Sequence, residues 1–106
     1  MPIKVMEVEP VEMMPGVWRR TLCYGDGVML AHFTLEEGAV VPPHRHPQEQ
    51  VGYVIEGELV MTVGDQTWPL KAGESYLAPA NVEHGAEAVK QVVLIDAFSP
   101  PRDDYK

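Results

Sequence analysis

One stretch of the sequence decides the fold, and it reads Gly38-Ala-Val-Val-Pro-Pro-His44-Arg-His46-Pro-Gln-Glu-Gln50-Val-Gly-Tyr-Val-Ile-Glu-Gly57. Side chains two residues apart on a β-strand point to the same face, about 6.5 to 7 Å apart along the strand. His44 and His46 can therefore direct both imidazoles at one metal ion. Gln50 has the same parity, although Pro47 interrupts the strand and leaves its direction open. Taken alone, the stretch is equally compatible with a solvated, histidine-rich turn.

The composition is that of a single folded domain. The chain has 106 residues, of which 45% are hydrophobic and 23% are charged, and such proportions are typical of globular proteins. A chain of this length forms one domain. We expect its core over about residues 17–98, an irregular N-terminal edge strand over about 3–14 and a C-terminal tail over 99–106.

The charge balance argues against two classes of partner. Sixteen acidic residues against eight basic ones give a net charge of −8. No cluster of Lys or Arg offers a surface for nucleic acid or for an anionic membrane. The longest apolar runs, such as residues 92–95, are far too short to span a bilayer. A small anionic ligand stays compatible with this charge, because a buried metal ion can dominate its local field.

The cysteine content and the N-terminus predict a cytoplasmic protein. Cys23 is the single cysteine, so no intrachain disulfide can form, and a reducing compartment is favoured. The first residues, Met-Pro-Ile-Lys-Val-Met-Glu, lack the apolar run of a signal peptide. No neighbour in sequence resembles a nucleophile's partner, so we expect Cys23 to be inert packing.

Turn signals recur every eight to twelve residues or so, and no stretch has helical periodicity over three turns. Strands are predicted over residues 17–24, 28–35, 50–56, 59–63, 67–70, 74–78 and 91–98. Glycine-containing turns such as Gly25-Asp26-Gly27 join them, since glycine accepts the positive φ that hairpin turns need. This pattern predicts an all-β sandwich or barrel.

A second segment, Gly73-Glu-Ser-Tyr-Leu-Ala-Pro79-Ala-Asn81-Val-Glu-His84, supplies another histidine just after a Pro/Asn turn. Together the two segments resemble the two signature motifs of the cupin superfamily, the small jelly-roll barrels. The spacing of the first motif is matched by Gly38, His44, His46, position 50 and Gly57. That of the second is matched by Gly73, Pro79 and His84, with Asn81 in place of a glycine. Asn tolerates the left-handed backbone nearly as well as Gly, so this exchange is minor.

The resemblance implies an all-β, single-domain jelly-roll barrel with one divalent metal ion in its mouth. The ion would be held by His44, His46, His84 and residue 50, and it could be Mn, Fe, Co, Ni or Zn, since imidazole suits them all. Barrel mouths are also where such folds bind small molecules. Position 50 is Gln where the general pattern has Glu, so Glu49 is the alternative ligand if the strand is reoriented.

Three imidazoles and a neutral amide leave the ion its full charge of about +2. Compared with a site that has an anionic ligand, such a site is a better Lewis acid and binds oxidised iron less well, which argues against a dioxygenase. The chain further resembles the short cupins of pectin degradation, which open the ring of unsaturated uronates. The resemblance rests on His46-Pro-Gln-Glu-Gln50-Val-Gly-Tyr and on the tail Asp96-Ala-Phe98-Ser-Pro-Pro-Arg102-Asp-Asp-Tyr105. In that family the glutamine ligand and a carboxylate on the last strand recur.

Two further side chains are candidates for chemistry. Asp96 lies on one face of the apolar strand 91–98, where a bare carboxylate is costly. It is either a strand-end Asp bonded to backbone amides or a general acid/base facing the metal, and the resemblance assigns it to catalysis. Arg102 is either an exposed arginine or folds over the barrel mouth to bind a carboxylate.

We therefore predict a non-redox enzyme that opens the ring of a 4,5-unsaturated uronate to a linear keto sugar. Asp96 would move a proton in metal-assisted acid/base chemistry, and the ligand would be small, anionic and sugar-like. The alternatives are a non-catalytic, metal-dependent binding module for a small oxyanion and an iron-dependent dioxygenase.

The chain also predicts a homodimer. The resemblance implies pairing through edge strands, which is common in small cupins, and mixed apolar outer faces, such as Val60 with Met61 and Val93 with Ile95, agree with it. Tyr53 and Tyr76 can reach either the cavity or the core, and we expect them to pack in the core.

Overall fold

A computed structural model describes residues 1–106, and nearly all of its regular structure is β. Ten strands follow one another along the chain: β1 (Val11–Met14), β2 (Val17–Tyr24), β3 (Met29–Leu35), β4 (Val40–His44), β5 (Glu49–Glu56), β6 (Glu58–Val63), β7 (Gln66–Lys71), β8 (Ser75–Ala78), β9 (His84–Ala88) and β10 (Val92–Ser99). Two 3-10 turns lie near the ends of the chain, η1 (Val5–Glu7) and η2 (Asp103–Tyr105). Neither of these turns, nor any other segment, forms a helix with the length and apolarity needed to cross a membrane.

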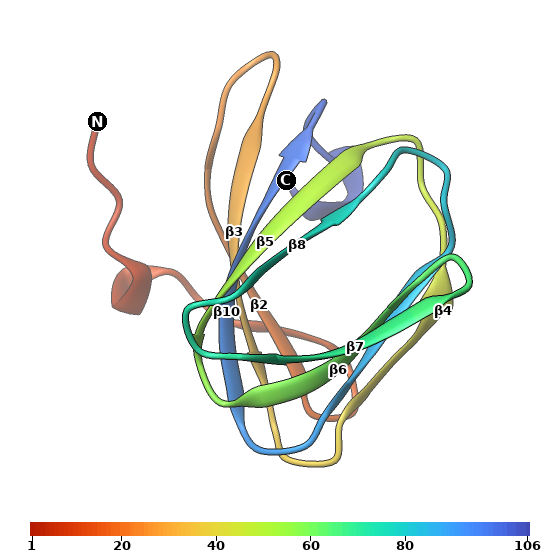
Figure 1. Cartoon of the computed structure of the whole chain (residues 1–106). Helices are drawn as coiled ribbons and strands as arrows, with labels where there is room; N and C mark the ends of the chain where they lie inside the picture. Colours follow the sequence, from red (N-terminus) through yellow and green to blue (C-terminus); the bar gives the residue numbers. More distant parts are fainter.

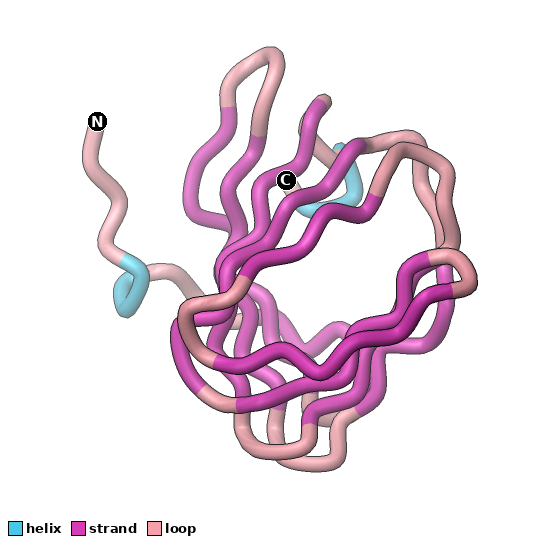
Figure 2. The backbone as a smooth tube through the Cα atoms, in the orientation of Figure 1, coloured by secondary structure: helices cyan, strands magenta, loops and turns pink.

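The strands form two antiparallel sheets that close on each other as a barrel (Figure 1). One sheet has six strands in the order β1-β2-β3-β10-β5-β8, and the other has four in the order β4-β9-β6-β7. Figure 2 shows that loops are mostly confined to the ends of the strands. Neighbours in each sheet are often far apart in sequence, as β10 is from β3. This arrangement confirms the predicted all-β jelly-roll barrel.

The core lies between the sheets and follows from strand alternation. In β3 every second residue is buried, and the same holds in β10, where Val92, Leu94, Asp96 and Phe98 face inward. Alternating burial is the pattern of a strand with one face on a core. β10 pairs with β3 on one side and with β5 on the other, so it lies inside the six-stranded sheet. It therefore carries a carboxylate, Asp96, into an otherwise apolar barrel.

The predicted strand bounds agree with the structure to within one residue for the seven predicted strands. β1 is an irregular strand at the edge of the six-stranded sheet, as expected, but it is shorter than predicted, because it spans only Val11–Met14 and η1 precedes it. β9 was not predicted, because it reads His-Gly-Ala-Glu-Ala and has no β-branched residue. β9 pairs with β4 and β6, and this tertiary pairing outweighs its low strand propensity.

Several surface expectations need correction. Met61 is only 4% exposed and packs in the core, because adjacent residues of a strand point to opposite faces. Tyr53 is 52% exposed, so it does not pack in the core. Cys23 is exposed as well and is not a packing residue.

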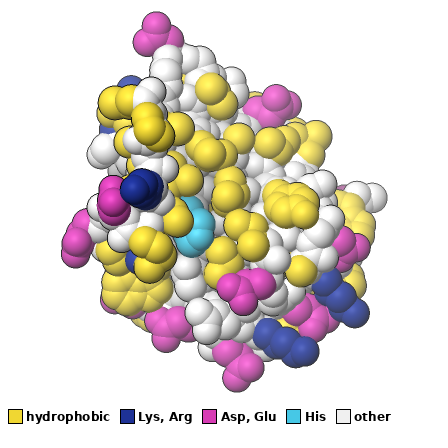
Figure 3. Space-filling view, turned by 90° about the vertical axis from the view of Figure 1, so that its left-hand side faces the viewer, with side chains coloured by type: hydrophobic (Ala, Val, Ile, Leu, Met, Phe, Trp, Pro, Cys, Tyr) yellow, Lys and Arg dark blue, Asp and Glu magenta, His cyan; other side chains and the backbone are white.

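Apolar side chains gather instead on the outer face of the six-stranded sheet. β5 exposes Val51, Tyr53 and Ile55 there, and β8 exposes Leu77 opposite Val51. Figure 3 looks onto the side of the molecule that carries this sheet, and hydrophobic side chains cover much of it around a histidine. We call Val51, Tyr53, Ile55 and Leu77 the outer apolar patch.

Candidate metal centre

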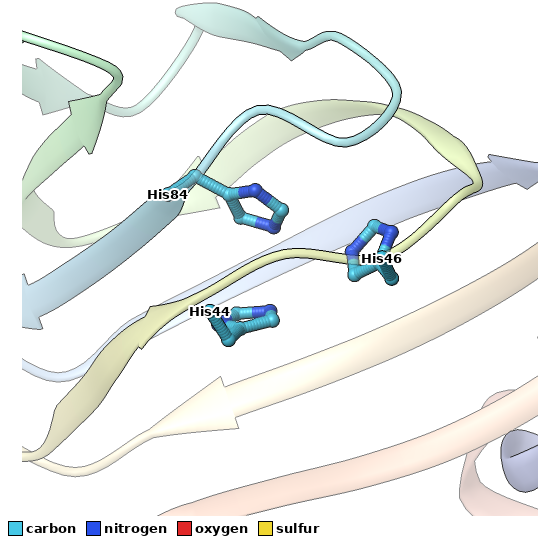
Figure 4. A group of neighbouring side chains, drawn as sticks. All are labelled: His44, His46 and His84. Carbon is cyan, nitrogen blue, oxygen red and sulfur yellow. The ribbon is translucent and has the colours of Figure 1, made fainter.

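Three histidines converge inside the barrel from two segments of the chain. His44 ends β4 and His84 begins β9, where the two are cross-strand partners. His46 follows in the loop before β5. The potential ligand atoms of the three lie within 4.8 Å of one another, and Figure 4 shows the rings turned toward a common point. The structure therefore brings together all three histidines that the sequence predicted as ligands.

Backbone carbonyls fix the tautomer of each ring. The Nδ1 atom of every histidine in the cluster lies 3.0 Å from a carbonyl oxygen two residues away: Pro42 for His44, Gln48 for His46 and Val82 for His84. A carbonyl only accepts hydrogen bonds, so Nδ1 carries the proton and Nε2 keeps a free lone pair. Metal-binding histidines are commonly oriented by such a bond from the second ring nitrogen.

Gln50 lies beside this cluster, and its amide oxygen faces His46. It is 7% exposed, and its Oε1 lies 3.0 Å from Nε2 of His46. Both atoms are acceptors, so no hydrogen bond joins them. Two ligands about 2.1 Å from one ion at a right angle lie about 3 Å apart, so this spacing fits neighbouring ligands of one cation. Glu49 is exposed on the opposite face of β5 and lies away from the cluster.

The nitrogen set also fits a metal. Nε2 of His84 is buried and has no hydrogen-bond partner, and buried polar atoms in proteins are rarely left unpaired. Burial lowers the pKa of His84 and of His46, which keeps both rings neutral and able to ligate. His44, His46, His84 and Gln50 can therefore hold one divalent transition metal.

Hydrogen bonds from the amide nitrogen of Gln50 to Tyr76 and Asp96 hold this side chain in place. Its Nε2 donates to Oδ2 of Asp96 at 3.0 Å and to the hydroxyl of Tyr76 at 2.6 Å. The Tyr76 hydroxyl in turn donates to Oδ1 of Asp96 at 2.9 Å. Both amide protons of Gln50 are used, so the amide oxygen is left to face His46. Asp96 bonds these two side chains and is not the strand-end Asp with backbone amide partners.

Asp96 has an unusual protonation equilibrium for a carboxyl. Burial raises its pKa to about 7, against the hydrogen bonds from Tyr76 and Gln50, which favour the ionised form. Burial and the neighbouring Asp96 raise the pKa of Tyr76 well above its usual range, so this side chain stays a neutral hydroxyl. An acid near neutrality exists in both protonation states, which is what a proton-transfer group requires.

Arg102 folds over the cavity, as one of the two sequence interpretations had it. Its guanidinium carbon lies 3.9 Å from the ring centre of Tyr105 and 5.7 Å from that of Phe98. Nη2 bonds Oδ2 of Asp104 at 2.9 Å, and Nη1 donates to the Tyr105 hydroxyl at 2.9 Å. The cation is thus already paired within the tail, and an incoming anion competes with Asp104 for it.

Gln50, Asp96 and Arg102 line one cavity of about 370 Å³ inside the barrel, together with His44 and His84 of the histidine cluster. It is lined by 22 residues, of which 13 are hydrophobic, so its few polar groups decide how a ligand is oriented. Those that argue for chemistry are His44, His84, Gln50, Asp96, Arg102 and Tyr76. Tyr76 packs against the core as predicted, and its hydroxyl also reaches the cavity, where it bonds Asp96 and Gln50. No sequence signal marks it, since its role depends on which strand lies next to β8.

The architecture and the site together define a class of protein. The chain is a small double-sheet β barrel with three histidines and a glutamine converging in its interior. Residues 31–98 also match a family model described as the Cupin domain. The chain therefore belongs to the cupin family, as its two motifs indicated.

Comparisons with known proteins narrow this class. The chain is 32% identical over 96 residues to the pectin degradation protein KdgF of Dickeya dadantii, covering 89% of this chain and 87% of that protein. It superposes on the structure of KdgF from Halomonas sp. with a TM-score of 0.95 at 30% identity, covering 100% and 98% of the two chains. The predicted resemblance to pectin-degradation cupins is confirmed.

An isomerase is another relative. The chain is 52% identical over 89 residues to the H2HPP isomerase of Bacillus subtilis, covering 81% of this chain but 37% of that protein. This chain therefore matches only about a third of the isomerase. A relative with enzymatic activity agrees with the expectation that this chain is an enzyme.

Proposed function

We propose that this cupin opens the ring of a 4,5-unsaturated uronate to a linear keto sugar. The observation that carries the proposal is Asp96, a buried carboxyl with a pKa of about 7 on the wall of the cavity that the histidine cluster shares. The likeness to KdgF supports pectin-derived sugar acids as substrates.

Four neutral ligands hold the metal in this proposal: His44, His46, His84 and Gln50. When bound, a divalent ion with neutral ligands supplies Lewis-acid polarisation of the oxygens of the sugar acid. The polar side of the cavity orients the substrate, and its apolar wall excludes water. Arg102 exchanges its Asp104 partner for the substrate carboxylate, because a guanidinium binds carboxylates through paired donors.

Asp96 carries the proton through the reaction. Its ionised carboxylate takes the proton of the anomeric hydroxyl, and the hemiacetal C–O bond breaks as the aldehyde forms. The electron pair moves through the ring oxygen, which becomes the keto oxygen, to the ring double bond. The carbon of that double bond distal to the carboxylate then takes the same proton back from Asp96. One proton moves from oxygen to carbon, and no redox partner or nucleophile is needed.

Ultraviolet absorbance tests this proposal directly. Metal-loaded protein is incubated with an unsaturated uronate, and a matched sample without protein records spontaneous ring opening. The conjugated absorbance should fall faster than this background and in proportion to protein. Traces that match the background with Mn, Fe, Co, Ni and Zn contradict the uronate proposal. Metal-dependent binding of the sugar acid without turnover favours the binding module, and oxygen consumption with iron favours the dioxygenase.

A second candidate is an isomerase that moves a proton within another conjugated carboxylate. The likeness to an isomerase and the largely hydrophobic cavity wall support it. The two candidates use Asp96 in the same way and differ in the body of the substrate. Incubation in deuterated water with a panel of unsaturated sugar acids and unsaturated apolar keto acids separates them by NMR. Deuterium that enters only the apolar substrates favours this second candidate.

We also propose a homodimer that pairs through the outer apolar patch. The four residues of the patch are uncharged, and the two exposed carboxylates of β5, Glu49 and Glu56, lie at its ends, so two copies can meet over the patch with little like-charge repulsion. Light scattering should give twice the 11.8 kDa mass of the chain, and Tyr53→Glu should halve it. A monomer at every concentration contradicts the proposal. The predicted cytoplasmic location stays a prediction.

A further inference from the structure

We propose that Tyr76 is a positioning residue of the metal centre, which acts through Gln50 and Asp96. Its hydroxyl fixes the Gln50 amide so that the oxygen, and not the nitrogen, faces His46. This inference rests on the metal-binding part of the proposed function and is independent of the substrate.

The hydrogen-bond pattern leaves the Gln50 amide one orientation. The Tyr76 hydroxyl donates its single proton to Oδ1 of Asp96 at 2.9 Å, so it can only accept from Gln50. The 2.6 Å contact with Gln50 must therefore come from the amide nitrogen. Asp96 accepts the second amide proton at 3.0 Å. A carboxylate alone would leave one amide proton unbonded in a buried place, which costs free energy.

The sheet is built to permit this contact. Gly52 of β5 is the cross-strand partner of Asp96 on β10 and of Tyr76 on β8. Tyr76 and Asp96 therefore lie two strands apart and meet across Gly52. A Cβ at this position would collide with Oδ1 of Asp96 and with the Tyr76 ring. The absence of a side chain at residue 52 opens the space in which the hydroxyl reaches the carboxylate.

The orientation of the Gln50 amide decides whether this side chain can bind a metal ion. An amide oxygen has a lone pair that binds divalent metals, whereas an amide NH₂ has none to offer. A rotated Gln50 amide would donate an N–H to the lone pair of His46 and remove the fourth ligand. Outer partners of metal ligands typically change metal affinity by about 10- to 100-fold when they are lost.

Cobalt binding tests the inference without any substrate. The visible spectrum of Co²⁺ reports its ligands, and competition with a chelator gives its dissociation constant. Tyr76→Phe removes only the hydroxyl, and we expect it to weaken cobalt binding about 10-fold and to change the visible spectrum. Tyr24→Phe is the matched control, because Tyr24 is exposed at the end of β2, outside the cavity and the outer apolar patch, and it should change neither.

A second pair of variants separates positioning from a general structural effect. If Tyr76 acts through Gln50, Tyr76→Phe should have no further effect on cobalt affinity in a Gln50→Ala background. The inference is overturned by a Tyr76→Phe affinity within twofold of wild type. It is also overturned by an equal loss in both backgrounds. A wild-type protein that binds no cobalt contradicts the metal centre itself. A wild-type protein that binds cobalt but opens no uronate ring contradicts only the proposed reaction and leaves this inference standing.

Discussion

The two halves of the candidate site are held together in different ways. Each histidine is oriented by a backbone carbonyl two residues away, so the segment that carries the ligand also orients it. The other half joins Gln50, Tyr76 and Asp96, which are 20 to 46 residues apart in the chain. The first half, which we call the histidine half, is oriented by contacts that are local in sequence. The second, which we call the carboxyl half, forms only because β8, β5 and β10 lie side by side. Loss of a histidine should therefore weaken metal binding most, whereas the second half should contribute the fourth ligand, Gln50, and the proton-transfer group, Asp96.

The largest effect is expected from the histidine half. His84→Ala removes a ligand, so metal affinity should fall by more than the roughly 100-fold upper range for outer partners. Wild-type protein should melt at a lower temperature after metal removal by a chelator, because bound ligands stabilise the folded state. His84→Ala should show no such shift. His32→Gln is the control, since it removes a histidine outside the cluster, and an unchanged chelator shift in His84→Ala would contradict the ligand assignment.

The carboxyl half can be broken without touching any polar group. Gly52→Ala inserts a Cβ between Tyr76 and Asp96, and overpacking of this kind typically costs about 1–3 kcal/mol. Chemical denaturation should show that loss in the free energy of unfolding, together with weaker cobalt binding. Gly27→Ala is the matched control, because nothing lies within 4 Å of a Cβ there. Equal stability and equal cobalt affinity in the two variants would contradict the strand-packing account.

The same contrast explains what the sequence could predict. His44, His46 and His84 lie in two contiguous segments that resemble the cupin motifs, so the resemblance was enough to predict them as ligands. Asp96 was found because alternation places it on the buried face of an apolar strand. The bonds from Tyr76 to Asp96 and Gln50 were not predicted, because nothing local in the sequence says that β5 lies between β8 and β10. β9 was missed for a similar reason, since its strand structure depends on pairing with β4 and β6.

Arg102 offers a smaller and more selective test of the ligand side. Arg102→Gln removes the cation that lies over the cavity, and hydrogen bonds to charged groups are worth about 1.5–3 kcal/mol. The KM for an unsaturated uronate should rise about 10-fold or more, with a smaller change in kcat, and metal affinity should not change. Arg45→Gln is the control, because Arg45 points outward and lies 3.8 Å from Glu83. An unchanged KM would show that the substrate carboxylate binds elsewhere.

The most direct test of the account is the comparison of wild-type protein with Asp96→Asn in the ultraviolet ring-opening assay, with metal content measured in both. Asn keeps an oxygen that can accept from Gln50 or Tyr76, so metal should stay bound. Since general acid–base catalysis contributes about 10²- to 10⁴-fold, turnover should fall at least 100-fold. Turnover by Asp96→Asn within a few-fold of wild type, with the metal retained, would contradict the assignment of Asp96 as the proton carrier.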